Sequence, residues 1–123
     1  MTQYIKERYG LLINGEWVEA EGGRTFDTFN PATGEKLATC ADATAADVER
    51  AVKAARAAQP AWAAKSVQER AALLLKIADR IDERAKELAT VETLDNGKPI
   101  RETMAIDVPY SSDHFRYYAS AIR

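Results

Sequence analysis

The stretch formed by residues 92–99 ends the longest helical pattern of this 123-residue chain and begins a second one. Asn96 and Gly97 can adopt the left-handed backbone conformation that closes a helix. Pro99 fits the first turn of the next helix, where a missing N–H costs no hydrogen bond. Local chemistry alone explains this stretch as a helix C-cap. A stretch of this kind predicts one helix before it and another after it.

The first third of the chain has the alternation and the turns of short β-strands. Residues 11–13 and 16–20 flank Asn14-Gly15, a pair that tolerates the positive φ angles of a tight two-residue hairpin turn. Residues 25–29 alternate with a period of two, and residues 35–41 follow a run of turn formers. We therefore expect an antiparallel β meander within residues 1–43.

The remainder, residues 44–123, carries helical patterns with recognisable starts. Thr44 and Asp47 form a capping pair, and Pro60 is expected to end the helix that they begin, leaving Trp62 in the connection. Ser66 and Glu69 form a capping box before a long apolar stripe.

That apolar stripe fits either one long helix or two helices with a break near residues 82–84. After residue 100 the pattern stays helical, but Pro109 removes a backbone hydrogen bond and should kink or split the helix. The expected fold class is α+β, an antiparallel meander followed by three or four amphipathic helices.

Composition disfavours several classes of partner. The 17 Lys and Arg residues are interleaved with 19 Asp and Glu residues, which gives a net charge of -2 and no general attraction to nucleic acid or anionic membranes. No stretch approaches the ~20 apolar residues of a membrane span, and the first eight residues lack the apolar run of a signal peptide. Cys40 is the single cysteine, so an internal disulfide is excluded and a cytoplasmic location is expected.

Residues able to carry catalysis are few. The sequence has no glycine-rich nucleotide-binding motif, no His-Glu-x-x-His and no pair of cysteines. Cys40 has no evident base beside it and is interpreted as an inert buried thiol, and the single histidine, His114, as a surface or packing residue. Asp95 differs, because a carboxylate at the C-terminal end of a helix opposes the helix dipole. Lys98 or a bound ion could compensate its charge.

Four motifs occur in an order and spacing that resemble a known family. They are Leu-Ile-Asn-Gly-Glu-Trp at 12–17, Phe-Asn-Pro-Ala-Thr-Gly-Glu at 29–35, Ala-Val-Lys-Ala-Ala at 51–55 and Glu-Thr-Leu-Asp-Asn-Gly-Lys-Pro at 92–99. Together, and continued by Arg-Tyr-Tyr-Ala at 116–119, they resemble the N-terminal segment of the NAD(P)-dependent aldehyde dehydrogenase superfamily. Residues 66–70 and 113–117 are most similar to bacterial acetaldehyde dehydrogenases.

The resemblance implies a parent enzyme that oxidises an aldehyde to a carboxylic acid with NAD or NADP. In that family a Cys thiolate attacks the aldehyde, an oxyanion hole holds the adduct, hydride passes to the nicotinamide, and a Glu activates the water that hydrolyses the thioester. Members are several times longer, and their catalytic Asn, cofactor loop, general-base Glu and nucleophilic Cys lie beyond the point corresponding to Arg123. Cys40 does not align with the nucleophile. The chain alone is therefore expected to be inactive, with no catalytic or cofactor-binding residue.

The resemblance also implies two sites within this segment. Many members hold a structural sodium or potassium ion through backbone oxygens of the two residues before the Asn-Pro pair and the carboxylate of the Asp-Asn-Gly motif, which here are Thr28, Phe29 and Asp95. One face of the third helix contributes to the substrate tunnel, which points to Ile106 and Tyr110. Ordinary packing would explain these last two residues equally well.

Two hypotheses follow for residues 1–123. The first is a truncated N-terminal segment of an aldehyde dehydrogenase, whose partners are the remainder of the chain, a small aldehyde and further copies in a homo-oligomer. The last helix supports this hypothesis, because it reaches Arg123 without a Gly, Asn or Pro to stop it. The alternative is a free-standing, non-catalytic α+β interaction module that uses its aromatic C-terminus as a partner surface.

Overall fold

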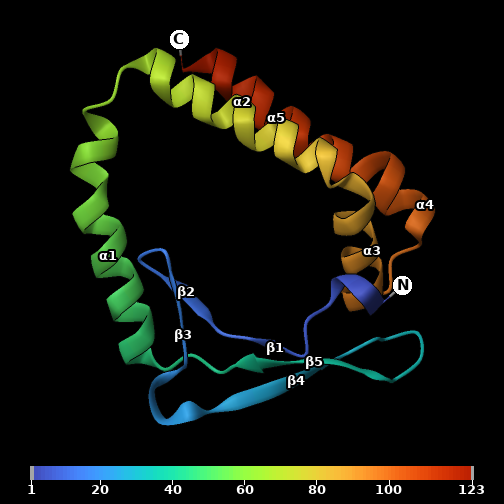
Figure 1. The fold of residues 1–123 in the computed structure, drawn as a ribbon. Coiled ribbons are helices and arrows are strands. Elements are labelled where there is room, and N and C mark those ends of the chain that lie inside the picture. The colour runs from blue at the N-terminus through green and yellow to red at the C-terminus, as the bar shows by residue number, and fades with distance from the viewer. Residues whose placement is uncertain (1, 123) are drawn as a thin grey trace. The chain divides into compact units, whose positions relative to one another are not determined.

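The structure is a computed structural model that describes residues 2–122, and it has the α+β composition expected from the sequence (Figure 1). Two compact units are present: Ile5–Ala64, and residues 65–122 together with residues 2–4. The first unit contains all the strands and one long helix, and the second contains the other helices. No helix among residues 2–122 is both long enough and apolar enough to span a membrane.

The first unit contains two small sheets in place of the single antiparallel meander that the sequence predicts. β2 (Leu11–Ile13) and β3 (Glu16–Val18) form the expected hairpin, with Asn14 and Gly15 at φ angles of 53° and 81°. β4 (Thr25–Phe29) and β5 (Lys36–Ala41) form a second antiparallel pair. The short β1 (Arg8–Tyr9) joins the other edge of β5 in parallel.

The single meander is wrong because β3 and β4 do not pair and because β1 adds a parallel strand. Two residues are too few to show a period of two, and their partner on β5 is about thirty residues away in the sequence. Gly10 then carries the chain from β1 into the hairpin. A Cβ atom at Gly10 would lie 2.8 Å from the backbone oxygen of Val18, so only glycine allows this close approach.

Helix α1 (Ala45–Ala63) begins at the predicted capping box. Thr44 Oγ1 accepts a hydrogen bond from the Asp47 backbone N–H at 3.3 Å, and Asp47 Oδ2 accepts one from the Thr44 backbone N–H at 2.8 Å. The Asp47 side chain is 1% exposed, contacts the Arg50 guanidinium, and accepts from the Glu21 backbone N–H at 3.1 and 3.2 Å. One carboxylate therefore ties the start of α1 to the η2 turn (Glu21–Gly23).

Helix α1 also continues three residues beyond Pro60, where the sequence predicts its end, and Trp62 lies in its last turn. Pro60 removes only the helical hydrogen bond to the Arg56 carbonyl, and Arg56 is exposed, so water can satisfy that oxygen. The Ala64 backbone N–H then donates to Pro60 O at 3.0 Å and closes the helix. The position of Pro60 near the helix end makes the missing bond tolerable.

In the second unit, the long apolar stripe forms two helices. α2 (Val67–Glu83) starts at the predicted Ser66–Glu69 capping box, and the backbone leaves helical geometry at Arg84, with φ -107° and ψ 17°. α3 (Ala85–Asn96) follows and ends at Gly97, which has the expected left-handed conformation at φ 82°. Pro99 precedes α4 (Ile100–Glu102) as its N-cap, one position earlier than predicted.

Helices α2 and α5 (Val108–Ala121) run side by side (Figure 1). Their most deeply buried residues are small: Ala71 and Ala78 in α2 are 0% exposed, and Ser112 and Ala119 in α5 are each 2% exposed. Small side chains let two helix axes approach closely, because little volume separates the backbones. The large side chains of α5 are consequently left on its other faces.

We predict that Asp47→Asn lowers the melting temperature of the chain by several degrees and weakens its acid sensitivity. The backbone N–H of Thr44 and the other donors hold the pKa of Asp47 well below its ordinary value of 3.8. A carboxylate with a lowered folded-state pKa stabilises above about pH 4, and that stabilisation is lost as the pH falls. Thermal unfolding at a series of pH values between about 3 and 6, followed by tryptophan fluorescence, measures both effects.

Asp42→Asn is the matched control, since Asp42 pairs at the surface with Arg24. Exposed pairs contribute roughly 0–1 kcal/mol, so its unfolding curve should stay near that of the wild type. Equal losses in both variants would contradict a special role for Asp47.

Candidate functional site

The last helical segment is interrupted before Pro109, as the sequence predicts. Residues Thr103–Asp107 form a π-helical turn, η3, in which the Val108 backbone N–H bonds to Thr103 O, five residues earlier. Pro109 has no N–H to offer the Ala105 carbonyl, and widening the preceding turn by one residue lets the helix continue. Such turns occur frequently at functional sites. The predicted tunnel residue Ile106 lies within it.

Thr103 anchors the start of this turn in the second unit. Its side chain is 0% exposed, and its hydroxyl lies 3.1 Å from Ala89 O and 3.2 Å from Ile100 O, to either of which it can donate. Thr93 Oγ1 lies 2.9 Å away and supplies the complementary donor. The hydroxyl is therefore satisfied as both donor and acceptor, and it joins α3 to η3.

An ion pair holds the other end of η3. Lys98 Nζ lies 2.7 Å from both carboxylate oxygens of Asp107 and donates to Oδ1. The hydrogen bond to Asp107 raises the pKa of Lys98. Lys98, which the sequence offered as a compensating cation for Asp95, is thus engaged with Asp107.

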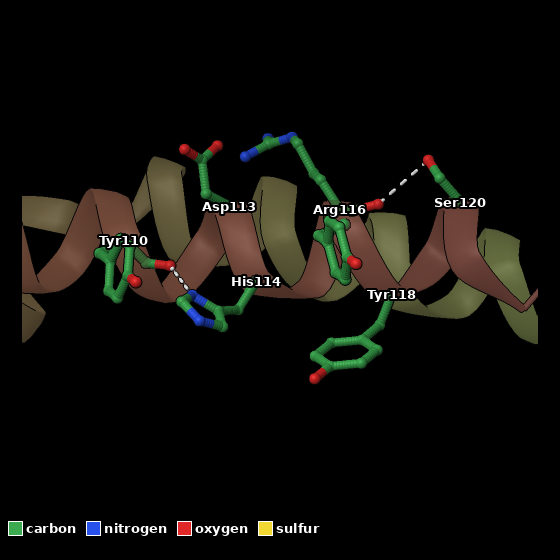
Figure 2. A pocket seen from close by; sticks show the side chains of 7 residues that line it. Tyr110, Asp113, His114, Arg116, Tyr118 and Ser120 are labelled. Atoms are coloured by element: carbon green, nitrogen blue, oxygen red, sulfur yellow. Dashed lines mark hydrogen bonds between the residues drawn. The ribbon is translucent and has the colours of Figure 1, made fainter.

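A shallow hollow lies on α5, immediately after this turn (Figure 2). All of its lining residues come from this one helix: Tyr110, Asp113, His114, Arg116, Tyr117, Tyr118 and Ser120. Tyr110, Tyr117 and Tyr118 are 64%, 67% and 56% exposed, so the hollow has aromatic, half-solvated walls. Exposed aromatic groups of this kind mark surfaces that contact another molecule or another part of a protein.

Tyr110 and His114 form the best-defined pair in the hollow. Their ring centroids are 4.3 Å apart at an interplanar angle of 77°, an edge-to-face arrangement. His114 Nδ1 lies 2.7 Å from the backbone oxygen of Tyr110, and Figure 2 shows both side chains on the same side of the helix. Residues four apart on a helix are neighbours, which is why this pair can form.

Arg116, by contrast, is directed to the neighbouring helix. Its Nη2 donates to Asp79 Oδ1 at 3.0 Å and to Asp82 Oδ2 at 2.7 Å, both on α2. Hydrogen bonds from Ser112 and Arg116 lower the pKa of Asp82. Arg116 therefore helps to fix the orientation of α5, so that Tyr110 and His114 remain on the exposed side.

The predicted tunnel residues Ile106 and Tyr110 belong to the same helical segment, and both are accessible, at 52% and 64% exposure. The predicted cation ligands are distributed differently. Thr28 and Phe29 end β4 in the first unit, whereas Asp95 is the penultimate residue of α3 in the second. The cation site stays a prediction.

Local geometry around Thr28 and Phe29 is compatible with exposed backbone oxygens. β4 is an edge strand of its sheet, so alternate oxygens point away from β5. The ladder is irregular here, because Thr28 pairs with Ala38 but Phe29 pairs with Lys36. Oxygen donors of this type suit a hard monovalent cation.

The described residues show no grouping of side chains that would bind a metal ion. Within residues 2–122, no three or more His, Cys, Asp or Glu side chains are grouped so as to hold a metal ion. Cys40 is half-buried in β5, where the sequence places it in a strand.

Two contacts in the second unit go beyond what the sequence predicts. His114 is a surface and packing residue, as expected, but its contact with Tyr110 was not predicted, although their four-residue spacing was a usable signal. Thr103 had no sequence signal, because a threonine within a helical pattern gives no indication of whether its hydroxyl is buried.

The described residues thus form a strand-rich unit and a helical unit that carries an aromatic face on α5. Residues 17–123 match the aldehyde dehydrogenase family, and the chain belongs to this family. It is 51% identical over 119 residues to an aldehyde dehydrogenase of Paracoccus denitrificans and 50% identical to aldehyde dehydrogenase B of Escherichia coli. Each alignment covers 97% of this chain and 23% of the relative, so the chain spans about a quarter of their length.

A solved structure supports the same conclusion. The NAD+ complex of an aldehyde dehydrogenase from Bacillus cereus superposes with a TM-score of 0.91 at 44% sequence identity, over 95% of this chain and 24% of that one. The α+β arrangement and the membership predicted from the four motifs are therefore confirmed.

We predict that Thr103→Val destabilises the second unit by about 1–3 kcal/mol, because the Ala89 carbonyl and the Thr93 hydroxyl lose a buried partner while side-chain volume is kept. Urea denaturation followed by circular dichroism at 222 nm measures the change. Ser120→Ala is the control, since Ser120 is exposed and its hydroxyl contacts only a solvent-side carbonyl at 3.3 Å. A Thr103→Val curve that overlays the wild type would contradict the anchoring role.

Proposed function

We propose that residues 1–123 are the N-terminal segment of an NAD(P)-dependent aldehyde dehydrogenase that oxidises an aldehyde to a carboxylic acid. The observation that carries this proposal is that nearly the whole chain aligns with about one quarter of the length of each aldehyde dehydrogenase that it matches. The NAD+ complex of the Bacillus cereus relative favours NAD as the cofactor. The similarity of residues 66–70 and 113–117 supports acetaldehyde as a substrate.

In this proposal the chain supplies architecture to the active site and no reacting group. Ile106 and Tyr110 are proposed to line the substrate tunnel, which is consistent with their exposure on the π-helical turn and the start of α5. The nucleophilic thiol, the general base and the cofactor-binding loop are proposed to come from the remainder of the enzyme. The 123-residue chain alone is therefore proposed to be inactive.

A structural sodium or potassium ion is proposed to bind the backbone oxygens of Thr28 and Phe29 and the carboxylate of Asp95. The position of Thr28 and Phe29 at the end of the edge strand β4 is consistent with this proposal. Such an ion would offset a carboxylate that opposes the dipole of α3. The ion is proposed to have a structural role and no part in the reaction.

The full-length enzyme is further proposed to be a cytoplasmic homo-oligomer. The single cysteine of residues 1–123, which cannot form a disulfide within this segment, is consistent with a reducing compartment. The exposed aromatic residues of α5 support burial by another part of the assembled enzyme.

Complementation tests the proposed function. Residues 1–123 are joined to the remaining three quarters of E. coli aldehyde dehydrogenase B, in place of its own corresponding segment, and NADH formation is measured with acetaldehyde. We expect activity within about tenfold of the parent enzyme, because 50% identity keeps most packing positions. Residues 1–123 and the remainder, each assayed alone, should be inactive.

A soluble, cooperatively melting chimera without aldehyde-dependent NADH formation would count against the proposal. A compact, cooperatively unfolding 123-residue monomer that neither binds the remainder nor restores its activity would favour the free-standing interaction module.

We predict that Asp95→Ala in the full-length enzyme lowers the melting temperature more in sodium or potassium chloride than in a bulky organic-cation chloride. Only a small cation could bridge the carboxylate and the two backbone oxygens, so the variant should lose the ion-dependent part of the stability. Glu35→Ala, at an exposed turn, is the control. If Asp95→Ala lowers the melting temperature equally in both salts, Asp95 acts only at the end of its helix and binds no ion.

A further inference from the structure

We infer that His114 is a positioning residue that fixes the ring of Tyr110 and thereby sets which aldehydes the tunnel accepts. This inference rests on the proposed function, in which Tyr110 lines the tunnel. His114 is proposed to act through Tyr110 and to have no contact with the reacting atoms.

The hydrogen bond between His114 and the Tyr110 backbone has a defined direction. The Tyr110 backbone oxygen can only accept, so His114 Nδ1, 2.7 Å away, must carry the proton and donate. The imidazole is then held at two points, by its own Cβ and by this bond. Its ring plane is fixed relative to the helix.

The imidazole ring of His114 contacts the phenol ring of Tyr110. With centroids 4.3 Å apart and planes at 77°, an edge meets a face, the arrangement that the charge distributions of aromatic rings favour. Figure 2 shows the two rings next to each other along the helix. The imidazole therefore favours one orientation of the phenol ring.

Within residues 2–122 the Tyr110 ring is 64% exposed, so this chain leaves several staggered side-chain conformations of Tyr110 sterically open apart from its contact with His114. A tunnel wall made by an unrestrained ring would present a variable surface. A substrate with a flat or bulky group would then have to order the ring on binding, which weakens binding.

The substrate class follows from this argument. Aldehydes that carry an aromatic or extended apolar group pack against the positioned ring, whereas acetaldehyde has too little surface to do so. His114 is therefore expected to lower KM for the larger aldehydes and to leave the rate of the chemical step unchanged.

The test uses the active full-length chimera and compares acetaldehyde, hexanal and benzaldehyde. His114→Ala should raise KM for benzaldehyde by about two- to tenfold, the range corresponding to one edge-to-face aromatic pair. The kcat should stay the same, and KM for acetaldehyde should change less. Lys76→Ala, on the exposed side of α2, is the control for substitution as such.

Two substitutions separate the ring from the hydrogen bond. His114→Phe keeps an aromatic edge, so its KM for benzaldehyde should lie close to that of the unsubstituted chimera. His114→Asn keeps a hydrogen-bond donor without a ring, so its KM should stay as high as that of His114→Ala. In a Tyr110→Ala background, His114→Ala should have no further effect, because the two residues act as one unit.

The outcomes distinguish the two proposals. A chimera that forms no NADH overturns the proposed function and this inference with it. An active chimera in which His114→Ala leaves all three KM values unchanged, or alters kcat equally for all three aldehydes, overturns the positioning role alone. Failure of His114→Phe to restore KM has the same meaning.

Discussion

The close packing of α2 against α5 is the constraint on which the second unit depends. Ala71 and Ala78 meet a helix whose most deeply buried positions, Ser112 and Ala119, are also small. Small residues on both helices bring the axes together and leave no room for large side chains between them. Arg116 adds ion pairs to α2 at the edge of this contact. The aromatic residues of α5 are therefore placed on the exposed side, where they form the candidate site.

The π-helical turn before Pro109 determines which residues at the start of α5 are exposed. A proline inside a regular helix would leave the Ala105 carbonyl without its donor, and the wider turn accommodates this loss. Thr103 and the Lys98–Asp107 pair hold the two ends of the turn. As a result, Ile106 and Tyr110 lie on the accessible side of one segment, with His114 one turn later. The candidate site thus follows from the same local chemistry as the helix interruption.

Much of the local structure was predictable because it depends on neighbouring residues. The Asn14-Gly15 hairpin, both capping boxes, the left-handed Gly97 and the interruption at Pro109 each follow from interactions within about five residues. The single meander failed for the opposite reason, because β1 is too short to show a pattern and its partner on β5 is distant in sequence. The end of α1 at Pro60 failed because a proline close to a helix end costs only one solvent-accessible hydrogen bond.

The sequence by itself determined the family, the α+β class, and the turns and helix starts, since motifs and caps are encoded in consecutive residues. Only the tertiary structure decided that Asp47 joins α1 to the η2 turn, that Thr103 is buried between α3 and η3, and that the ring of His114 contacts that of Tyr110. The physical reason is that burial and side-chain orientation depend on which elements pack together, and helical spacing permits such contacts without requiring them.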